Sequence, residues 1–126
     1  MIQLIYFKSN STNLKEKYIL HIITNGFDKT QHTKLKHANL TPYFNQIITS
    51  EKTGVKKPNP AIFDHAINLA KATKEKSVYI GDDLVVDILA CQNFGMKGIY
   101  FNPEKKEHKE KVAFEISCLS QIKEIL

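Results

Sequence analysis

The chain has 126 residues and a formal net charge of +5, with 42% hydrophobic and 25% charged residues. This length and composition are typical of one globular domain with a substantial core, and they exclude a disordered chain. Because the basic residues are spread over mixed-charge runs with few aromatic residues among them, the charge does not indicate nucleic-acid binding.

Two further classes of protein are disfavoured by short stretches of the sequence. Residues 1–7 are apolar, but they are too few to span a membrane and lack the flanks of a signal peptide, so we expect no membrane association. Cys91 and Cys118 lack the spacing of a metal site. We expect both to be small buried residues of a cytoplasmic protein rather than a disulfide.

In chain order, residues 2–7 are the first segment that could form a strand, and a polar loop follows over residues 8–13. Residues 18–23 form an apolar run interrupted only by His21, which is typical of a strand covered on both faces. We interpret His21 as a packing residue, because no second histidine stands at the spacing of a metal ligand.

The strand over residues 18–23 ends in Thr24, Asn25 and Gly26. A threonine hydroxyl followed by backbone N–H groups in a glycine turn can make a small anion cradle at the carboxyl end of a strand. An ordinary turn from strand to helix also explains this tripeptide, and the tripeptide alone favours that interpretation.

The middle of the chain predicts a helix, a strand and a second helix. Residues 30–39 predict a basic amphipathic helix with Leu35 and Ala38 on its inner side, and residues 46–50 predict a strand. After a polar loop, Asn59 and Pro60 predict the start of the second helix. Its buried face is expected to contain Ile62, Phe63, Ala66, Ile67 and Ala70.

Lys57 lies in the polar loop just before that second helix. A lysine in such a loop is usually solvated, but this one follows the end of a strand and could also neutralise a phosphate group.

The most acidic stretch follows a short strand over residues 78–80, which Gly81 ends in a tight turn. Asp82 and Asp83 come directly after this glycine, and a helix over residues 84–94 places Asp87 about one turn further on. Ligands of open parallel sheets bind just outside the carboxyl ends of strands. Two interpretations remain open here, a site for a hard cation such as Mg²⁺ and a helix start capped by an aspartate.

The rest of the chain completes an alternation of strands and helices. We expect a strand over residues 98–101, a charged loop over 102–111, a strand over 114–118 and a closing helix over 119–126. This alternation predicts an α/β fold, a three-layer, doubly wound (Rossmann-like) parallel sheet.

Taken together, these loops resemble the motifs of the haloacid dehalogenase (HAD) superfamily of hydrolases. Residues 22–26 resemble the second motif of that family, a hydrophobic strand ending in serine or threonine. Residues 54–63 resemble the third motif, whose lysine steadies the nucleophile and the phosphoryl group and here is the catalytic candidate Lys57. The resemblance implies phosphate binding by Thr24, Asn25, Gly26 and Lys57.

Residues 81–87 resemble the fourth motif of the family, which implies that Asp82 binds Mg²⁺ and that Asp87 supports it as a second metal-site acid. The resemblance runs from about residue 18 to residue 102. The branch of pyrimidine 5′-nucleotidases and related phosphatases is indicated by three shorter stretches, Asn25–Phe27, Thr41–Phe44 and Ser50–Glu51.

The sequence departs from the family at its first motif. That motif, Asp-x-Asp-x-Thr or Val, carries the nucleophile and the acid/base aspartate, but no aspartate precedes Thr24 in this chain. The cap domain between the first and second motifs is also absent. We therefore expect a truncated protein with an incomplete HAD-like core, in which residues 1–17 are an irregular N-terminal segment and residues 18–126 carry motifs two to four.

The missing first motif also affects the sheet. The strand of that motif lies at the sheet centre in the family, between the strands that end here at Thr24 and Asp82. Without it those two strands must pair directly, leave a gap, or recruit residues 2–7 as a surrogate strand, and we favour the surrogate. Unpaired strand edges would invite self-association or a complementing N-terminal fragment from another chain.

Three functions follow from this sequence. The first is a HAD-like phosphatase of small phosphorylated substrates such as nucleoside 5′-monophosphates, inactive as this isolated chain and binding Mg²⁺ weakly through one matched carboxylate, Asp82. The second is a non-catalytic remnant that binds phosphate or complements another fragment. The third is a phosphoacceptor receiver domain, which the order Thr24, Lys57, Asp82 disfavours. A contribution of Asp83 to metal binding is left open.

Overall fold

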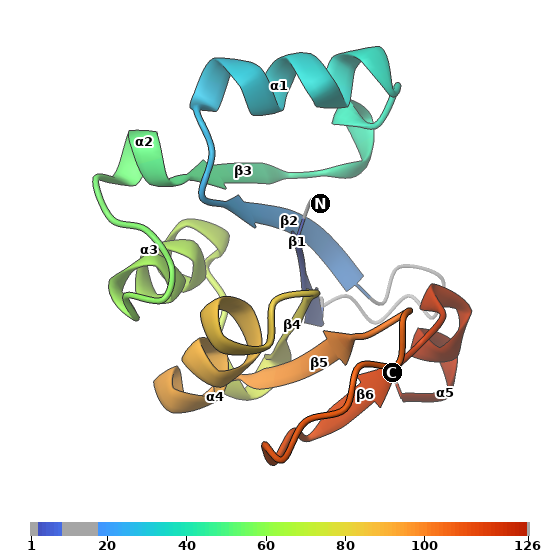
Figure 1. The fold of residues 1–126 in the computed structure, drawn as a ribbon. Coiled ribbons are helices and arrows are strands. Elements are labelled where there is room, and N and C mark those ends of the chain that lie inside the picture. The colour runs from blue at the N-terminus through green and yellow to red at the C-terminus, as the bar shows by residue number, and fades with distance from the viewer. Residues whose placement is uncertain (1–2, 9–17, 126) are drawn as a thin grey trace.

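The structure is a computed structural model that describes residues 3–8 and 18–125 (Figure 1). One sheet of six strands has the order β3-β2-β1-β4-β5-β6. The strands are β1 (Gln3–Lys8), β2 (Tyr18–Thr24), β3 (Gln46–Thr49), β4 (Ser77–Gly81), β5 (Lys97–Phe101) and β6 (Phe114–Ile116). The pairs β2–β3, β4–β5 and β5–β6 are parallel, as the sequence predicts.

Strand β1 is the exception, because it runs antiparallel to both of its neighbours in the middle of the sheet. It pairs with β2 from Gln3 to Lys8 and with β4 from Leu4 to Phe7. This is the place in which we hypothesised a surrogate strand, although Ile2 itself lies outside the described residues. The loop expected over residues 8–13 lies, beyond Lys8, outside them too.

The helices follow the predicted alternation. They are α1 (Asp28–His37), α2 (Ser50–Thr53), α3 (Ala61–Ala70), α4 (Ala90–Phe94) and α5 (Ile122–Ile125). Short 3₁₀ turns are η1 (Thr41–Tyr43), η2 (Lys74–Lys76) and η4 (Leu119–Gln121), whereas η3 (Leu84–Leu89) is a π-helical segment that leads into α4. The helix expected over residues 84–94 therefore begins with a wider turn.

The core lies on both faces of the sheet, because successive residues of a strand point to opposite sides. On one face Tyr79 of β4 packs against α3, with the Tyr79 and Phe63 rings 5.2 Å apart, edge to face. On the other face Ile80 shares a cluster with Ile122 of α5. Figure 1 shows α3 and α4 on one side of the sheet and α5 on the other. These layers confirm the three-layer α/β fold.

Helix α3 buries most of the face that its sequence spacing predicts, since Ile62, Phe63, Ala66 and Ile67 are buried and Ala70 is partly buried. The start of the helix is also as expected, because the Asn59 side chain accepts a hydrogen bond from the Ala61 N–H at 2.9 Å.

Two burial predictions are wrong. Ala38 is exposed although Leu35 is buried, because α1 ends at His37 and Ala38 caps it instead of continuing its inner face. Cys118 is exposed whereas Cys91 is buried, because β6 ends at Ile116 and Cys118 lies at the cap of η4. Among the helices of the described segments, none is long and apolar enough to cross a membrane.

The central position of β1 leads to a prediction about hydrogen exchange. The amides of Leu4–Phe7 are expected to exchange slowly, at rates like those of β2 and β4, because an interior strand is bonded on both sides. Exchange followed by NMR checks this, with the edge strand β6 as the comparison. Exchange of Leu4–Phe7 as fast as in an unstructured peptide would contradict the central placement.

Buried His21 leads to a prediction about pH. Burial lowers the pKa of His21 from 6.5 to about 4, so below pH 6.5 the unfolded chain binds a proton that the folded chain accepts only near pH 4. Stability is therefore expected to fall as the pH falls through this window, by roughly 3 kcal/mol from this residue.

Urea denaturation at pH 7 and pH 4 measures this loss in the wild type and in His21→Gln. The variant should lose less stability between the two pH values, whereas His65→Gln, at an exposed histidine, should behave as the wild type does. Equal losses in the wild type and in His21→Gln would show that His21 is not the source.

Candidate functional site

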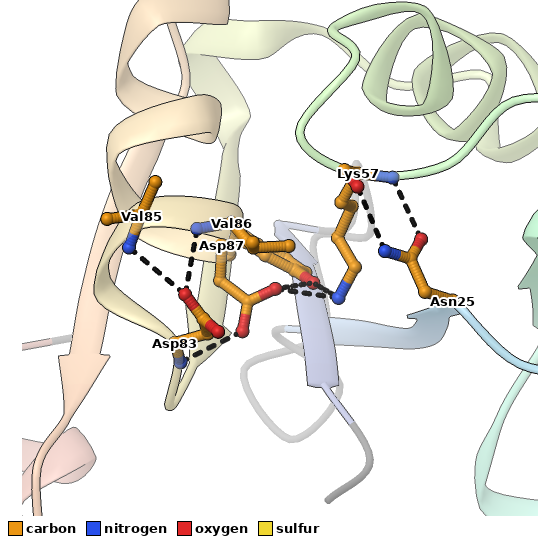
Figure 2. A network of polar contacts seen from close by, with 7 residues as sticks. Asn25, Lys57, Asp83, Val85, Val86 and Asp87 are labelled. Carbon is orange, nitrogen blue, oxygen red and sulfur yellow. Dashed lines mark hydrogen bonds and ion pairs between the residues drawn. The ribbon is translucent and has the colours of Figure 1, made fainter.

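The loops that follow β2 and α2 are joined by one side chain. The Asn25 amide donates to the Lys57 carbonyl at 2.9 Å, and the Lys57 N–H donates back to Asn25 Oδ1 at 2.8 Å (Figure 2). Two hydrogen bonds across 32 residues hold the Lys57 backbone against the carboxyl end of β2. Asn25 therefore positions the loop from which the Lys57 side chain extends.

The Lys57 side chain is buried, not solvated. Its Nζ lies 2.6 Å from Asp87 Oδ1 and donates to the Tyr79 hydroxyl at 3.1 Å. The Tyr79 hydroxyl in turn donates to the same Asp87 oxygen at 3.2 Å. The three groups form a closed triangle around one carboxylate oxygen, and Figure 2 shows Lys57 and Asp87 pointing toward each other across it.

Burial and charge act against each other in this triangle. Burial lowers the pKa of Lys57, and the negative charges of Asp87, Asp82 and Asp83 oppose that change. Burial also raises the pKa of Tyr79, with a further contribution from Asp87, so its hydroxyl remains a neutral donor. A buried charge without its counter-ion is costly, so Lys57 and Asp87 depend on each other.

Asp83 caps the helix that carries Asp87. Its Oδ1 accepts hydrogen bonds from the N–H groups of Val85 and Val86 at 3.1 and 2.9 Å, and its own N–H donates to Asp87 Oδ2 at 3.1 Å. The capping interpretation of the acidic turn thus applies to Asp83.

Gly81 makes room for this arrangement. A Cβ atom at this position would lie 2.6 Å from Asp87 Oδ2, closer than side chains approach one another. The inward orientation of Asp87 therefore requires a glycine at position 81, just before Asp82 and Asp83.

Asp82 is exposed, as is Asp83, whereas Asp87 is buried. Asp82 borders a small pocket of about 80 Å³ between β4 and the loop that follows β5. The three carboxylates are thus divided among an exposed edge (Asp82), a helix cap (Asp83) and a buried ion pair (Asp87).

The described residues do not by themselves fit a Mg²⁺ site. Among them no three histidine, cysteine, aspartate or glutamate side chains are grouped so that they could hold a metal ion. Both oxygens of Asp87 already accept hydrogen bonds. Of the two predicted metal ligands, Asp82 is therefore the one whose carboxylate could bind Mg²⁺. Because Mg²⁺ requires six oxygen ligands, Asp82 alone would leave most positions to water. Weak Mg²⁺ binding at Asp82 and Asp87 stays a prediction.

The predicted phosphate-binding residues lie at the carboxyl end of β2. Thr24 is the last residue of β2, is buried, and pairs with Thr49 of β3. At Gly26 a Cβ atom would meet the end of the Gln31 side chain, which would have to move aside. The structure brings Asn25 together with Lys57, and it places Thr24 next to Asn25 in the same turn.

Sequence reasoning missed Tyr79. The sequence predicts Tyr79 only as a strand residue, yet its hydroxyl completes the triangle with Lys57 and Asp87. A tyrosine in an otherwise apolar buried strand, two residues before the glycine of an acidic turn, was the available signal, because a buried hydroxyl needs a partner.

Comparison with protein families finds one match over most of the chain. Residues 9–101 match the family model described as haloacid dehalogenase-like hydrolase. The chain is 35% identical over 126 residues to a glyceraldehyde 3-phosphate phosphatase of Methanothermobacter thermautotrophicus, covering 94% of this chain and 56% of that relative. It is 34% identical over 108 residues to the pyrimidine 5′-nucleotidase YjjG of Escherichia coli, covering 83% and 48%.

A solved structure shows the same fold. The HAD-hydrolase YfnB of Bacillus subtilis, whose crystal structure is described as bound to magnesium, superposes with a TM-score of 0.80 at 32% identity. The match covers 90% of this chain and 50% of YfnB. The chain spans about half the length of the curated relatives that it matches.

The mutual dependence of Lys57 and Asp87 predicts a large loss of stability when either is neutralised. Asp87→Asn and Lys57→Met are each expected to cost about 3–5 kcal/mol, because each leaves a buried charge uncompensated. The double variant should cost less than the sum of the two.

Urea denaturation of the three variants measures this coupling. Lys56→Met, at the exposed neighbouring lysine, is the control and should change stability by no more than about 0.5 kcal/mol. Additive losses in the double variant would show that the two side chains do not act as a pair.

Proposed function

The chain belongs to the haloacid dehalogenase-like hydrolase family, and from this we propose that it carries the phosphate-binding and charge-stabilising part of a phosphomonoester hydrolase. The proposed substrates are small phosphorylated compounds such as nucleoside 5′-monophosphates. The names of two relatives, a pyrimidine 5′-nucleotidase and a glyceraldehyde 3-phosphate phosphatase, support this class of substrate.

The observation that carries the proposal is the fixed position of Lys57. Its backbone is held by Asn25 and its ammonium group by Asp87 and Tyr79, at the edge of the sheet where β2 and β4 end. A positive charge held in this way needs little rearrangement to stabilise a phosphoryl group. We propose that Thr24 and the turn after it supply hydroxyl and N–H donors to the same group.

The proposal also concerns what these 126 residues lack. In the family the first motif supplies the aspartate that attacks phosphorus and the aspartate that exchanges protons with the leaving oxygen and water. The first aspartate of this chain is Asp28, which follows the Thr24 turn. We therefore propose that the 126-residue chain hydrolyses phosphomonoesters little or not at all.

We further propose that it binds Mg²⁺ weakly, and that it is located in the cytoplasm.

A second candidate function, a complementing module, is favoured by the position of β1. This strand runs antiparallel between two strands that belong to an otherwise parallel sheet. A strand supplied by another polypeptide, carrying the two missing aspartates, could take this place if β1 left it. The chain would then bind phosphate and contribute Lys57, while the partner contributed the nucleophile.

An assay with p-nitrophenyl phosphate and Mg²⁺ tests the proposed inactivity. Neither the purified chain nor Asp82→Ala is expected to exceed the rate in buffer, because loss of a nucleophile removes several orders of magnitude in rate. Full-length YjjG serves as the positive control. Turnover by the chain but not by the variant would contradict the proposal, and the nucleophile would then be sought among Asp28, Asp64, Asp83 and Asp87.

The same assay separates the second candidate from the first. Addition of a polypeptide with an Asp-x-Asp-x-Thr strand should restore turnover with the wild-type chain, and should fail with Lys57→Ala. If the added polypeptide restores nothing while the chain still binds phosphate, the complementing function is rejected.

A further inference from the structure

A groove of about 490 Å³ opens beside the turn that positions Lys57. It is lined on one side by the loop from Asn25 to Phe27, and on the other by residues of α2 and of the loop behind it, from Ser50 to Lys56. This volume is typical of small-molecule sites.

Phe27 is the unusual side chain of this groove. It precedes α1, its side chain makes no capping hydrogen bond, and 70% of its surface is exposed. An exposed phenylalanine contributes little to the core, yet its ring offers a flat apolar face to a ligand. Val55 adds a second apolar side chain to the lining.

The groove is continuous with the proposed phosphate site, because Asn25 belongs to both. The Asn25 residue lines the groove, and its amide holds the Lys57 backbone through two hydrogen bonds. A molecule held by its phosphate at the turn after Thr24 would have this groove, with Phe27, next to it.

The opposite wall of the groove offers hydrogen-bonding groups. Ser50 and Glu51 line it, and neither side chain makes a hydrogen bond or ion pair with another residue in the described part of the chain. A serine hydroxyl can donate and accept, and a carboxylate can accept from the N–H groups at the edge of a heterocycle.

We propose that this groove binds the base of a nucleoside 5′-monophosphate, stacked on Phe27, with its edge facing Ser50 and Glu51. This assignment rests on the proposed function, since it takes the phosphate to lie at the Thr24 turn. A three-carbon phosphate ester has no planar ring, so it would leave Phe27 unused. The groove therefore favours nucleotides over short-chain phosphate esters.

Titration of the ¹⁵N-labelled chain followed by NMR tests the proposal, with uridine 5′-monophosphate, ribose 5-phosphate and inorganic phosphate as probes. The nucleotide should shift the amides of Phe27, Gly54 and Val55 together with those of the Thr24 turn. Phe27→Ala should weaken nucleotide binding at least about fivefold and leave ribose 5-phosphate binding unchanged, because only base stacking is removed.

Two control variants sharpen the result. Phe27→Tyr keeps an aromatic face and should retain the affinity for the nucleotide. Tyr43→Ala removes a similarly exposed ring, 66% accessible, from outside the groove and should have no effect.

The outcomes distinguish the groove assignment from the proposed phosphate binding. If all three probes shift only the Thr24 turn, with equal nucleotide affinity in wild type and Phe27→Ala, the groove assignment is wrong and the phosphate site stands. If no probe shifts the Thr24 turn, the proposed phosphate binding fails, and the groove assignment fails with it.

Discussion

The buried ion pair between Lys57 and Asp87 is the constraint on which the site depends. An ammonium and a carboxylate 2.6 Å apart, both removed from water, require each other, and their neighbours are arranged to hold them. Asn25 holds the lysine backbone, and Asp83 both caps the helix of Asp87 and bonds to its second oxygen. Gly81 leaves the space into which Asp87 points. The pair thus links three loops that are far apart in the sequence.

Strand β1 has a similar role for the sheet. It separates β3-β2 from β4-β5-β6 and is hydrogen-bonded to both, so the two halves meet only through it within the sheet. Its direction is opposite to that of its neighbours, so its amino end lies at the edge where Thr24 and Gly81 end their strands. The residues next to the site at the sheet centre are therefore those at the start of β1.

The proposed site separates two contributions that phosphoryl transfer requires. The part that holds charge, with Lys57 and Asp87 at its centre, is assembled within the described residues and satisfies its own hydrogen bonds. The 126 residues contain no Asp-x-Asp-x-Thr or Val motif, which in the family carries the nucleophile. The proposed phosphate binding does not need that motif, because a preorganised positive charge can bind a phosphate without a nucleophile beside it.

The sequence by itself determined the alternation of strands and helices, the buried face of α3, the positions of Thr24 and Asp82 at the ends of strands, and the loop position of Lys57. These features depend on periodicity, capping residues and glycine turns, which act over a few residues. Only the tertiary structure decided the direction of β1, the burial of Lys57, the contact of Tyr79 and the different roles of the three aspartates. The contacts of Lys57 with Tyr79 and Asp87 join residues 22 and 30 positions apart, and the direction of β1 depends on its strand partners, so packing decides these features.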